Sequence, residues 1–187
     1  MDSRMIYNRA SRLVRRCGTR DPVRIAEELG IRIYYEPELQ DLLGMYTYAF
    51  RHRLMILNSH MDEKLRSLVV AHELGHDALH RDIAKNGCLQ EFELFHIIDR
   101  TEYEANAFAA HILMDNEEIY SLARQGMDIV QIAGESGCGS VTMTLIKIQE
   151  MMHLGYDFRL PYEPDAEFFR RIRAGEAEGN MDPEQQP

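Results

Sequence analysis

Apolar residues recur every three or four positions along most of this chain, a spacing typical of helices with one buried face. The first such pattern covers residues 3–17 and stops before Gly18, which suits the end of a helix. The second begins at Asp21-Pro22, where an N-cap residue precedes a proline that fits the first helical turn. Further helices are predicted over residues 62–80, 99–114 and 117–124, and as a pair around Gly137 and Gly139 within residues 128–155.

Three short segments are instead rich in β-branched, aromatic and other apolar residues, as strands are. They cover residues 31–35, 45–50 and 53–58, and Arg51-His52 is predicted to form the tight turn between the last two. Residues 82–98 fit either a helix or a loop. The pattern as a whole predicts an α+β fold, mainly helical, with a small three-stranded antiparallel sheet.

The overall charge limits the kinds of partner. The chain has 187 residues and a formal net charge of -10, so as a whole it will not seek nucleic acid or an anionic membrane. Residues 1–32 differ, because they carry eight arginines against four acids. A solvated arginine-rich helix face accounts for this excess, and an acidic partner surface is the alternative.

Cysteine usage and hydropathy indicate a cytoplasmic protein. Cys17, Cys88 and Cys138 are odd in number and too widely spaced for a zinc knuckle or a redox motif. No run of about 18 apolar residues predicts a membrane span, and the arginine-rich N-terminal region does not resemble a signal peptide.

The segment His72-Glu73-Leu74-Gly75-His76 lies within the predicted helix over residues 62–80. Positions i and i+4 lie about 40° apart around a helix and about 6 Å apart along it, so His72 and His76 can hold one zinc ion. Glu73 lies about 100° round from His72, where it can reach a water molecule at the metal and act as a general base.

A catalytic zinc ion needs a third protein ligand and an open fourth position. The predicted helix over residues 99–114 is rich in alanine, which allows close approach to a neighbouring helix, and it carries Glu102 and Glu104. Because Glu104 shares a face with Phe108, it is predicted to point inward and to be the third ligand. Glu102 lies about 200° round the helix from Glu104 and is kept as the alternative.

Other polar residues are candidates for supporting roles. Three ligands from one straight helix would span about 12 Å, so His80 is assigned to the surroundings of the metal or to the end of the helix dipole. Tyr103, His111 and His80 are candidates for stabilising an oxyanion, and the strand containing Leu54 and Leu57 could pair with an extended peptide.

Together, these residues resemble the ImmA/IrrE family of zinc metallopeptidases. The resemblance rests on His72-Glu73-Leu74-Gly75-His76 and on Glu104-Ala105-Asn106-Ala107-Phe108-Ala109-Ala110, and it covers roughly residues 5–155. It implies His72, His76 and Glu104 as ligands of one Zn²⁺ ion per chain, with Glu73 as catalytic base. The family's usual Leu-Leu-Met-Pro ending is replaced by Ile112-Leu113-Met114-Asp115, which touches no predicted ligand.

The resemblance also implies an organisation and a function. We expect a zincin-like metallopeptidase domain over residues 1–125, a helix-turn-helix-like helical subdomain over 126–160 and an acidic tail over 161–187. Without a further sensor domain, the chain is most similar to the short anti-repressors of phages and integrative elements, which cleave a helix-turn-helix repressor. The alternative is a non-catalytic zinc-containing regulator or a DNA-binding protein. Direct DNA binding is disfavoured because residues 128–155 contain one lysine, no arginine and three acids.

Overall fold

The computed structural model describes residues 1–39, 42–49, 51–84, 89–91 and 100–158. Within these residues it contains eight helices and four strands. The helices are α1 (Ser3–Cys17), α2 (Pro22–Glu28), α3 (Glu63–Leu79), α4 (Arg81–Ala84), α5 (Arg100–Leu113), α6 (Asn116–Arg124), α7 (Ile129–Glu135) and α8 (Val141–His153). The strands are β1 (Arg32–Glu36), β2 (Gly44–Ala49), β3 (His52–Asn58) and β4 (Leu89–Glu91). The predicted α+β class is confirmed.

The helix ends lie where the sequence signals predicted them. Gly18 has a positive φ of 66° at the end of α1, and its N–H bonds to the carbonyl of Val14. Asp21 caps α2, with Pro22 in its first turn. Asp62 caps α3 by accepting a hydrogen bond from the N–H of Leu65 at 2.8 Å. These signals are local, which is why they can be recognised without knowing the fold.

The sheet differs from the prediction in strand number and direction. Its order is β1-β3-β2-β4, so the described sheet has four strands rather than three. β1 runs parallel to β3, whereas β2 is antiparallel to both β3 and β4. Ala49 pairs with His52, so the turn between β2 and β3 comes one residue earlier than Arg51-His52, and Arg51 has a left-handed φ of 65°. The predicted purely antiparallel sheet is therefore wrong.

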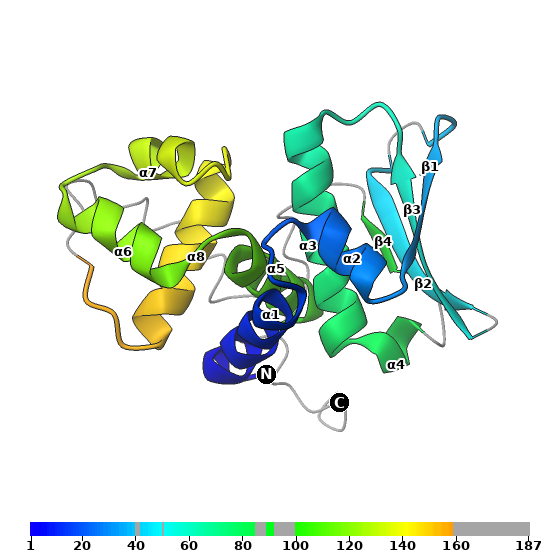
Figure 1. Cartoon of the computed structure of the whole chain (residues 1–187), viewed down its shortest axis with the longest axis horizontal. Coiled ribbons are helices and arrows are strands. Elements are labelled where there is room, and N and C mark those ends of the chain that lie inside the picture. Colours follow the sequence, from blue (N-terminus) through cyan, green and yellow to red (C-terminus); the bar gives the residue numbers. More distant parts are fainter. Residues whose placement is uncertain (40–41, 50, 85–88, 92–99, 159–187) are drawn as a thin grey trace, which may run out of the picture.

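The helix α3 is the centre of the molecule. It packs against α5 on one side and against strands β2 and β3 of the sheet on the other (Figure 1). Because both sides are covered, every residue from Leu68 to Asp77 is buried. Buried apolar side chains from α1 to α8 form one continuous core across the described part of the chain.

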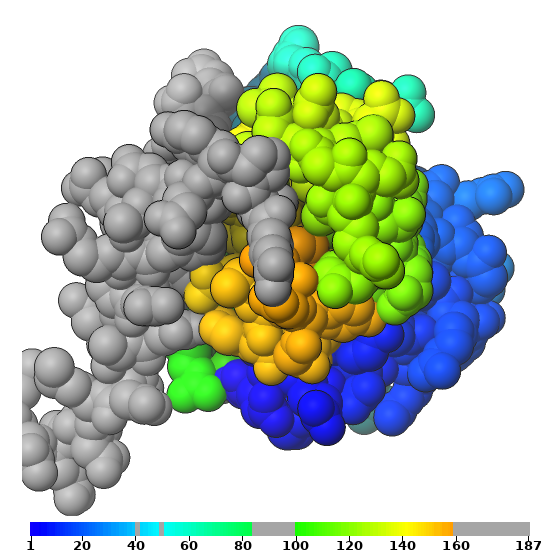
Figure 2. All heavy atoms as spheres, turned by 90° about the vertical axis from the view of Figure 1, so that its left-hand side faces the viewer, coloured from blue at the N-terminus to red at the C-terminus, as the bar shows by residue number. Residues whose placement is uncertain are grey.

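The helices α6, α7 and α8 lie at the end of the molecule opposite the sheet, beside α1 (Figures 1 and 2). The helix α7 begins with a capping box of Asp128 and Gln131, and Ser140 caps α8. The likeness of this region to a helix-turn-helix and the domain boundaries at residues 125 and 160 stay predictions. The predicted tail over residues 161–187 lies outside the described residues, as do most of residues 82–98.

Candidate metal centre

Two helices bring the candidate ligands together at the point where they come closest. A Cβ atom added to Gly75 would lie 2.8 Å from both the Cα and the carbonyl oxygen of Ala105, so α3 and α5 are almost in backbone contact. The absence of a side chain at Gly75 is therefore what lets α5 come this close to α3. His72 and His76 flank Gly75 on α3, and Glu102 and Glu104 lie three residues and one residue before Ala105 on α5.

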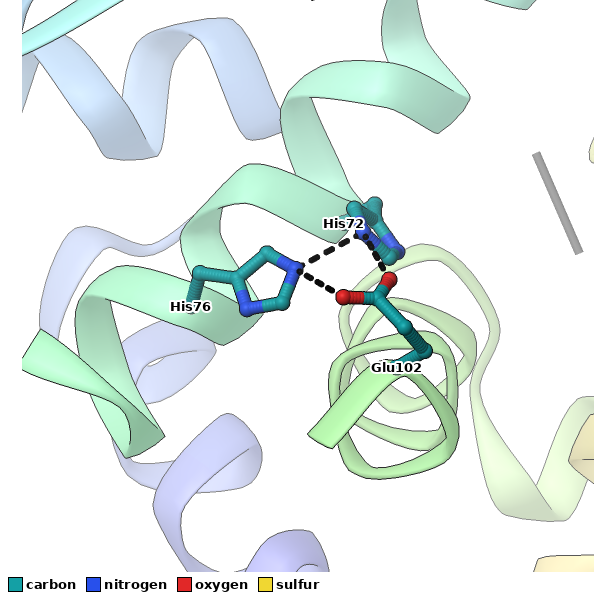
Figure 3. A group of neighbouring side chains, drawn as sticks. All are labelled: His72, His76 and Glu102. Atoms are coloured by element: carbon teal, nitrogen blue, oxygen red, sulfur yellow. Dashed lines mark hydrogen bonds and ion pairs between the residues drawn. The ribbon is translucent and has the colours of Figure 1, made fainter. Parts of the chain in front are cut away.

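His72, His76 and Glu102 form a compact group of donor atoms (Figure 3). The Nε2 atoms of the two histidines lie 2.9 Å apart. One carboxylate oxygen of Glu102, Oε2, lies 3.3 Å from Nε2 of His72. The other, Oε1, lies 3.5 Å from Nε2 of His76. Both imidazoles are buried, whereas the Glu102 side chain retains 20% exposure, so the group is accessible from the side of Glu102.

These separations fit a zinc ion. Ligand atoms at about 2.0–2.1 Å from a tetrahedral metal lie about 3.3 Å from one another. The three separations of 2.9, 3.3 and 3.5 Å spread around that value. Two imidazole nitrogens and one carboxylate oxygen are also a donor set that zinc uses in catalytic sites, with a fourth position left for water or substrate.

The charge on Glu102 suits a cation. Burial opposes its ionisation, but the hydrogen bonds from His72 and His76 outweigh that effect and hold the pKa of its carboxyl group well below the usual range. The side chain is therefore a carboxylate at neutral pH, the form in which it can bind a metal ion.

Glu104 does not join the two histidines, contrary to the sequence prediction. It is buried, as predicted, but its Oε2 lies 3.1 Å from Nε2 of His80 and its Oε1 accepts a hydrogen bond from Nε of Arg100 at 2.9 Å. The reason lies in the helix crossing. Ala105 marks the contact line with α3, and Glu102, three residues earlier, lies only about 60° from that line, against about 100° for Glu104. The buried face of α5 is thus broader than the face that meets His72 and His76.

Glu73 lies on the side of α3 that faces the sheet. Its side chain is 1% exposed, and a Cβ atom added to Gly44 at the start of β2 would lie 3.5 Å from its Oε1. Gly44 also lies against Val69 and Leu57, so the glycine leaves room for the packing of α3 on β2 beside this carboxylate. Glu73, the expected general base, is therefore buried on the strand side of the helix.

Sequence reasoning missed Asn106, whose Oδ1 lies 3.0 Å from Nδ1 of His72. Asn106 follows Glu102 by one helical turn, and residues spaced i, i+4 share a face. That spacing was the signal that could have identified it, because a metal-binding histidine is commonly held through its second nitrogen.

A second missed group surrounds Asp77, the residue after His76. Its carboxylate accepts hydrogen bonds from the hydroxyl of Tyr46 at 2.5 Å, from Arg53 at 3.2 Å and from Arg81 at 2.9 Å. Burial and the bond to Asp77 together raise the pKa of Tyr46 well above its usual range, so its hydroxyl stays protonated and donates. Asp77 thereby ties α3 to strands β2 and β3.

Several candidates for peptide and oxyanion contacts have other partners in the structure. The strand that contains Leu54 and Leu57 is β3, which is paired on both sides by β1 and β2, so it cannot accept an added strand. The hydroxyl of Tyr103 donates to Glu150, and Nδ1 of His111 lies 3.0 Å from Nζ of Lys147. These two side chains therefore contact α8 rather than the metal group.

Comparison with known proteins shows the family of this chain. The family model Peptidase_M78, described as the IrrE N-terminal-like domain, matches residues 26–143. The chain belongs to the Peptidase_M78 family. The match to this family confirms the resemblance drawn from the two motifs, and it spans the sheet, both ligand-bearing helices and the start of α8.

Among curated proteins, this member of the Peptidase_M78 family is similar to "Uncharacterized immunity region protein 2" of Bacillus phage phi105. The two are 31% identical over 110 residues, which cover 59% of this chain and 68% of the phage protein. Across the part of the chain that the structure describes, no helix is both long and apolar enough to cross a membrane.

Proposed function

We propose that this chain is a zinc-dependent endopeptidase that cleaves a helix-turn-helix transcriptional repressor, as an ImmA-like anti-repressor of a mobile genetic element. The observation that carries the proposal is the convergence of His72, His76 and Glu102, whose ligand atoms all lie within 4.8 Å of one another. Membership of a peptidase family and similarity to a phage immunity-region protein support it.

In this proposal one Zn²⁺ ion per chain is held by Nε2 of His72, Nε2 of His76 and the carboxylate of Glu102. When bound there, the ion would supply Lewis acidity, which would polarise the scissile carbonyl and lower the pKa of a bound water molecule. The carboxylate of Glu73 takes a proton from the attacking water and delivers it to the amine that leaves when the peptide bond breaks. Because Glu73 is almost fully buried, its carboxylate is screened from bulk water, which strengthens its interaction with that proton.

The burial of Lys147 favours a protein substrate over direct DNA binding by residues 128–155. This lysine is the only one in the segment, which contains no arginine, and it is 1% exposed. Its Nζ donates hydrogen bonds to the carbonyl of Met114 and to Asn116, so it is directed into the protein. Phosphate contacts require exposed cations, which this surface does not offer.

The test is cleavage of the helix-turn-helix repressor encoded beside this chain's gene. Wild-type protein loaded with zinc should cut the repressor into two fragments, whereas Glu73→Gln should yield none and still bind one zinc ion. Glu63→Gln, at the exposed first turn of the same helix, is the matched control and should cut like the wild type. Unchanged cleavage by Glu73→Gln, or by protein stripped of metal with a chelator, would contradict the proposal.

The alternative function, a non-catalytic zinc-containing or DNA-binding regulator, predicts a different set of results. Glu73→Gln would then leave regulation intact, and a gel shift would show salt-sensitive binding to duplex DNA. We expect no shift at a salt concentration of 150 mM, since the only lysine of residues 128–155 is buried.

A further inference from the structure

The outer side of α1 is composed largely of arginine. Seven residues of this helix are exposed, and all of them are arginine, asparagine or methionine. Five of the seven form what is here called the arginine face: Arg4, Arg9, Arg12, Arg15 and Arg16. Successive residues of a helix are about 100° apart, so the five lie within an arc of about 140° and span about 18 Å along the axis. Ile6 and Ala10 are buried on the opposite side, and α1 lies at the lower edge of the molecule in Figure 2.

No carboxylate of the described residues neutralises the arginine face. The helix α1 contains no acidic residue of its own. The ion pairs formed within the described part of the chain use other arginines, such as Arg20 with Asp115. From the arginine face, the hydrogen bonds to described residues go only to backbone carbonyl groups, from Arg9 and Arg15. Five positive charges are therefore available to an anion.

The spacing within the arginine face sets like charges against one another. Arg12 lies three residues from both Arg9 and Arg15 and four residues from Arg16, and residues at these spacings are neighbours on a helix. Arg4 lies in the first turn, where the helix dipole favours an acidic residue over a cation. A solvated helix face commonly alternates charges of both signs instead. An anion seated on the arginine face would relieve this repulsion.

We propose that the arginine face is a binding site for an acidic segment of the protein substrate, separate from the metal centre. The inference rests on the proposed function. Arginine and methionine are enriched at protein interfaces, whereas lysine and the acidic residues are depleted, and the exposed residues of α1 follow that composition. Each guanidinium group also presents N–H donors in a plane that matches both oxygens of a carboxylate.

The arginine face adjoins the end of the helix that carries His76. Nη1 of Arg9 donates a hydrogen bond to the carbonyl of Ala78 at 2.9 Å, and Ala78 is the second residue after His76 on α3. The helix α1 also packs along α5, the helix of Glu102. An acidic segment bound to α1 therefore keeps the adjoining part of the same substrate chain close to the proposed metal site.

The charge of the remaining molecule favours a short acidic segment over nucleic acid. The arginine face contributes +5 to a net charge of -10, so the rest of the chain carries -15. A DNA duplex is long and stiff and carries one charge per about 1.7 Å, so its phosphates would also meet this negative remainder. A short segment can pair with α1 alone, because salt screens charges more than about 8–10 Å away.

Fluorescence anisotropy with a labelled oligoglutamate peptide tests the site in the full chain. The wild type should bind this peptide with an affinity that falls as salt is added. An exposed charge pair is worth a factor of up to about five in affinity. The double variant Arg4→Glu/Arg12→Glu loses two such pairs and adds two repulsions, so it should bind roughly 10–100-fold more weakly.

Two further variants control for net charge and for folding. Arg32→Glu/Arg124→Glu changes the net charge by the same amount at exposed positions on β1 and α6, and it should bind oligoglutamate like the wild type. Arg12→Gln/Arg16→Gln adds no acid to α1 and should show a smaller loss in the same direction. Circular dichroism of each variant checks that the helices remain formed.

Cleavage kinetics on the repressor test what the site is for. In Arg4→Glu/Arg12→Glu the KM should rise by a similar factor while kcat stays unchanged, because only binding away from the reacting atoms is lost. Oligoglutamate should inhibit the wild type in competition with the repressor. A variant that was merely less stable would instead contain fewer active molecules, which lowers kcat and leaves KM unchanged.

Three results would overturn the inference while leaving the proposed function intact. One is binding of oligoglutamate by Arg4→Glu/Arg12→Glu equal to that of the control variant. Another is an unchanged KM for the repressor. The third is tighter binding of a short DNA duplex than of oligoglutamate, abolished by the same two substitutions. If the zinc-loaded wild type does not cut the repressor, the proposed function fails instead, and peptide binding still tests the arginine face.

Discussion

At the scale of single residues, Asp77 joins α3, the helix of His72 and His76, to the sheet by hydrogen bonds. Its carboxylate is 3% exposed and accepts from Tyr46, Arg53 and Arg81, and Arg53 also donates to the carbonyl of Leu29. One side chain thus links α3 to two strands and to the end of α2. Because it is next to His76 in the chain, a shift here would move one of the proposed metal ligands.

We predict that Asp77→Ala lowers the free energy of unfolding by about 3 kcal/mol, because it leaves the buried Tyr46 hydroxyl and the partly buried Arg53 without their acceptor. Chemical denaturation measures this loss. Glu28→Ala, at an exposed position on α2, is the control and should change stability by less than about 0.5 kcal/mol. Equal stability of the two variants would show that the Asp77 contacts are not needed for stability.

The sequence could predict that the side chains of His72 and His76 lie together, because their relation depends only on the geometry of one helix. The choice between Glu102 and Glu104 could not be made in the same way. It depends on where α5 crosses α3, and the contact of Gly75 with Ala105 sets that crossing. The apolar neighbours of Glu104 correctly indicated burial, but burial does not specify which side chain a residue meets.

At the scale of elements, the close approach of α3 and α5 depends on the absence of a side chain at Gly75. Ala is normally the better residue in a helix, by about 0.5–1 kcal/mol over Gly. At Gly75 the added methyl group would instead meet the backbone of Ala105 at 2.8 Å, and backbone cannot move aside cheaply. The packing of the two helices therefore opposes the local preference.

We predict that Gly75→Ala destabilises the protein by about 1–3 kcal/mol and weakens zinc binding, because it separates the two helices that supply the ligands. Gly134→Ala in α7 is a matched control, since a Cβ atom there has no heavy atom within 4 Å. That control should stabilise the protein by about 0.5–1 kcal/mol and leave zinc affinity unchanged. Thermal unfolding and zinc titration of both variants measure the contrast, and equal behaviour would contradict the account of the crossing.

Helices could be located from the sequence more readily than the sheet could be assembled. Helix signals such as the caps at Asp62 and Asp128 act over a few residues. Strand order depends on partners far along the chain. β1, for example, pairs in parallel with β3, although β2 comes between them in the sequence. Because β3 occupies the middle of the sheet, the idea that it could receive a peptide strand fails for a reason that no local pattern contains.

At the scale of the whole molecule, a buried polar network joins α5 to the helices at the far end. Lys147 on α8 donates to Asn116 at 2.6 Å and to the carbonyl of Met114 at 2.8 Å, and it contacts His111 on α5. Glu150, also on α8, accepts from Tyr103 on α5 at 2.5 Å. The helix α5, which carries Glu102, is therefore tied to α8 by polar contacts as well as by the apolar core.

Burial lowers the pKa of Lys147 to about 7, and the positive charge of Arg20 adds to this, opposed by Asp115 and Glu150. Above pH 7 the folded protein loses this proton while the unfolded chain, with an ordinary lysine pKa of 10.5, keeps it. The unfolded state then binds more protons, so we predict that stability rises with pH above 7 by up to about 1.4 kcal/mol per pH unit.

Denaturant unfolding at several pH values from 7 to 9 tests this prediction when wild type is compared with Lys147→Met. The variant should be less stable at all of these pH values, because Asn116 and the carbonyl of Met114 lose their donor. It should also lack the rise with pH that the wild type shows. Parallel pH profiles for the two proteins would mean that Lys147 does not titrate in this range.

The central claim is that His72, His76 and Glu102 bind a single zinc ion, and crystallography of the zinc-loaded chain at the zinc absorption edge tests it most directly. We predict one anomalous peak per chain, about 2.0–2.2 Å from Nε2 of His72, Nε2 of His76 and a carboxylate oxygen of Glu102. Glu104 should remain bonded to His80, as it is here. A peak ligated by Glu104 in place of Glu102, or no peak at the histidine pair, would contradict the account.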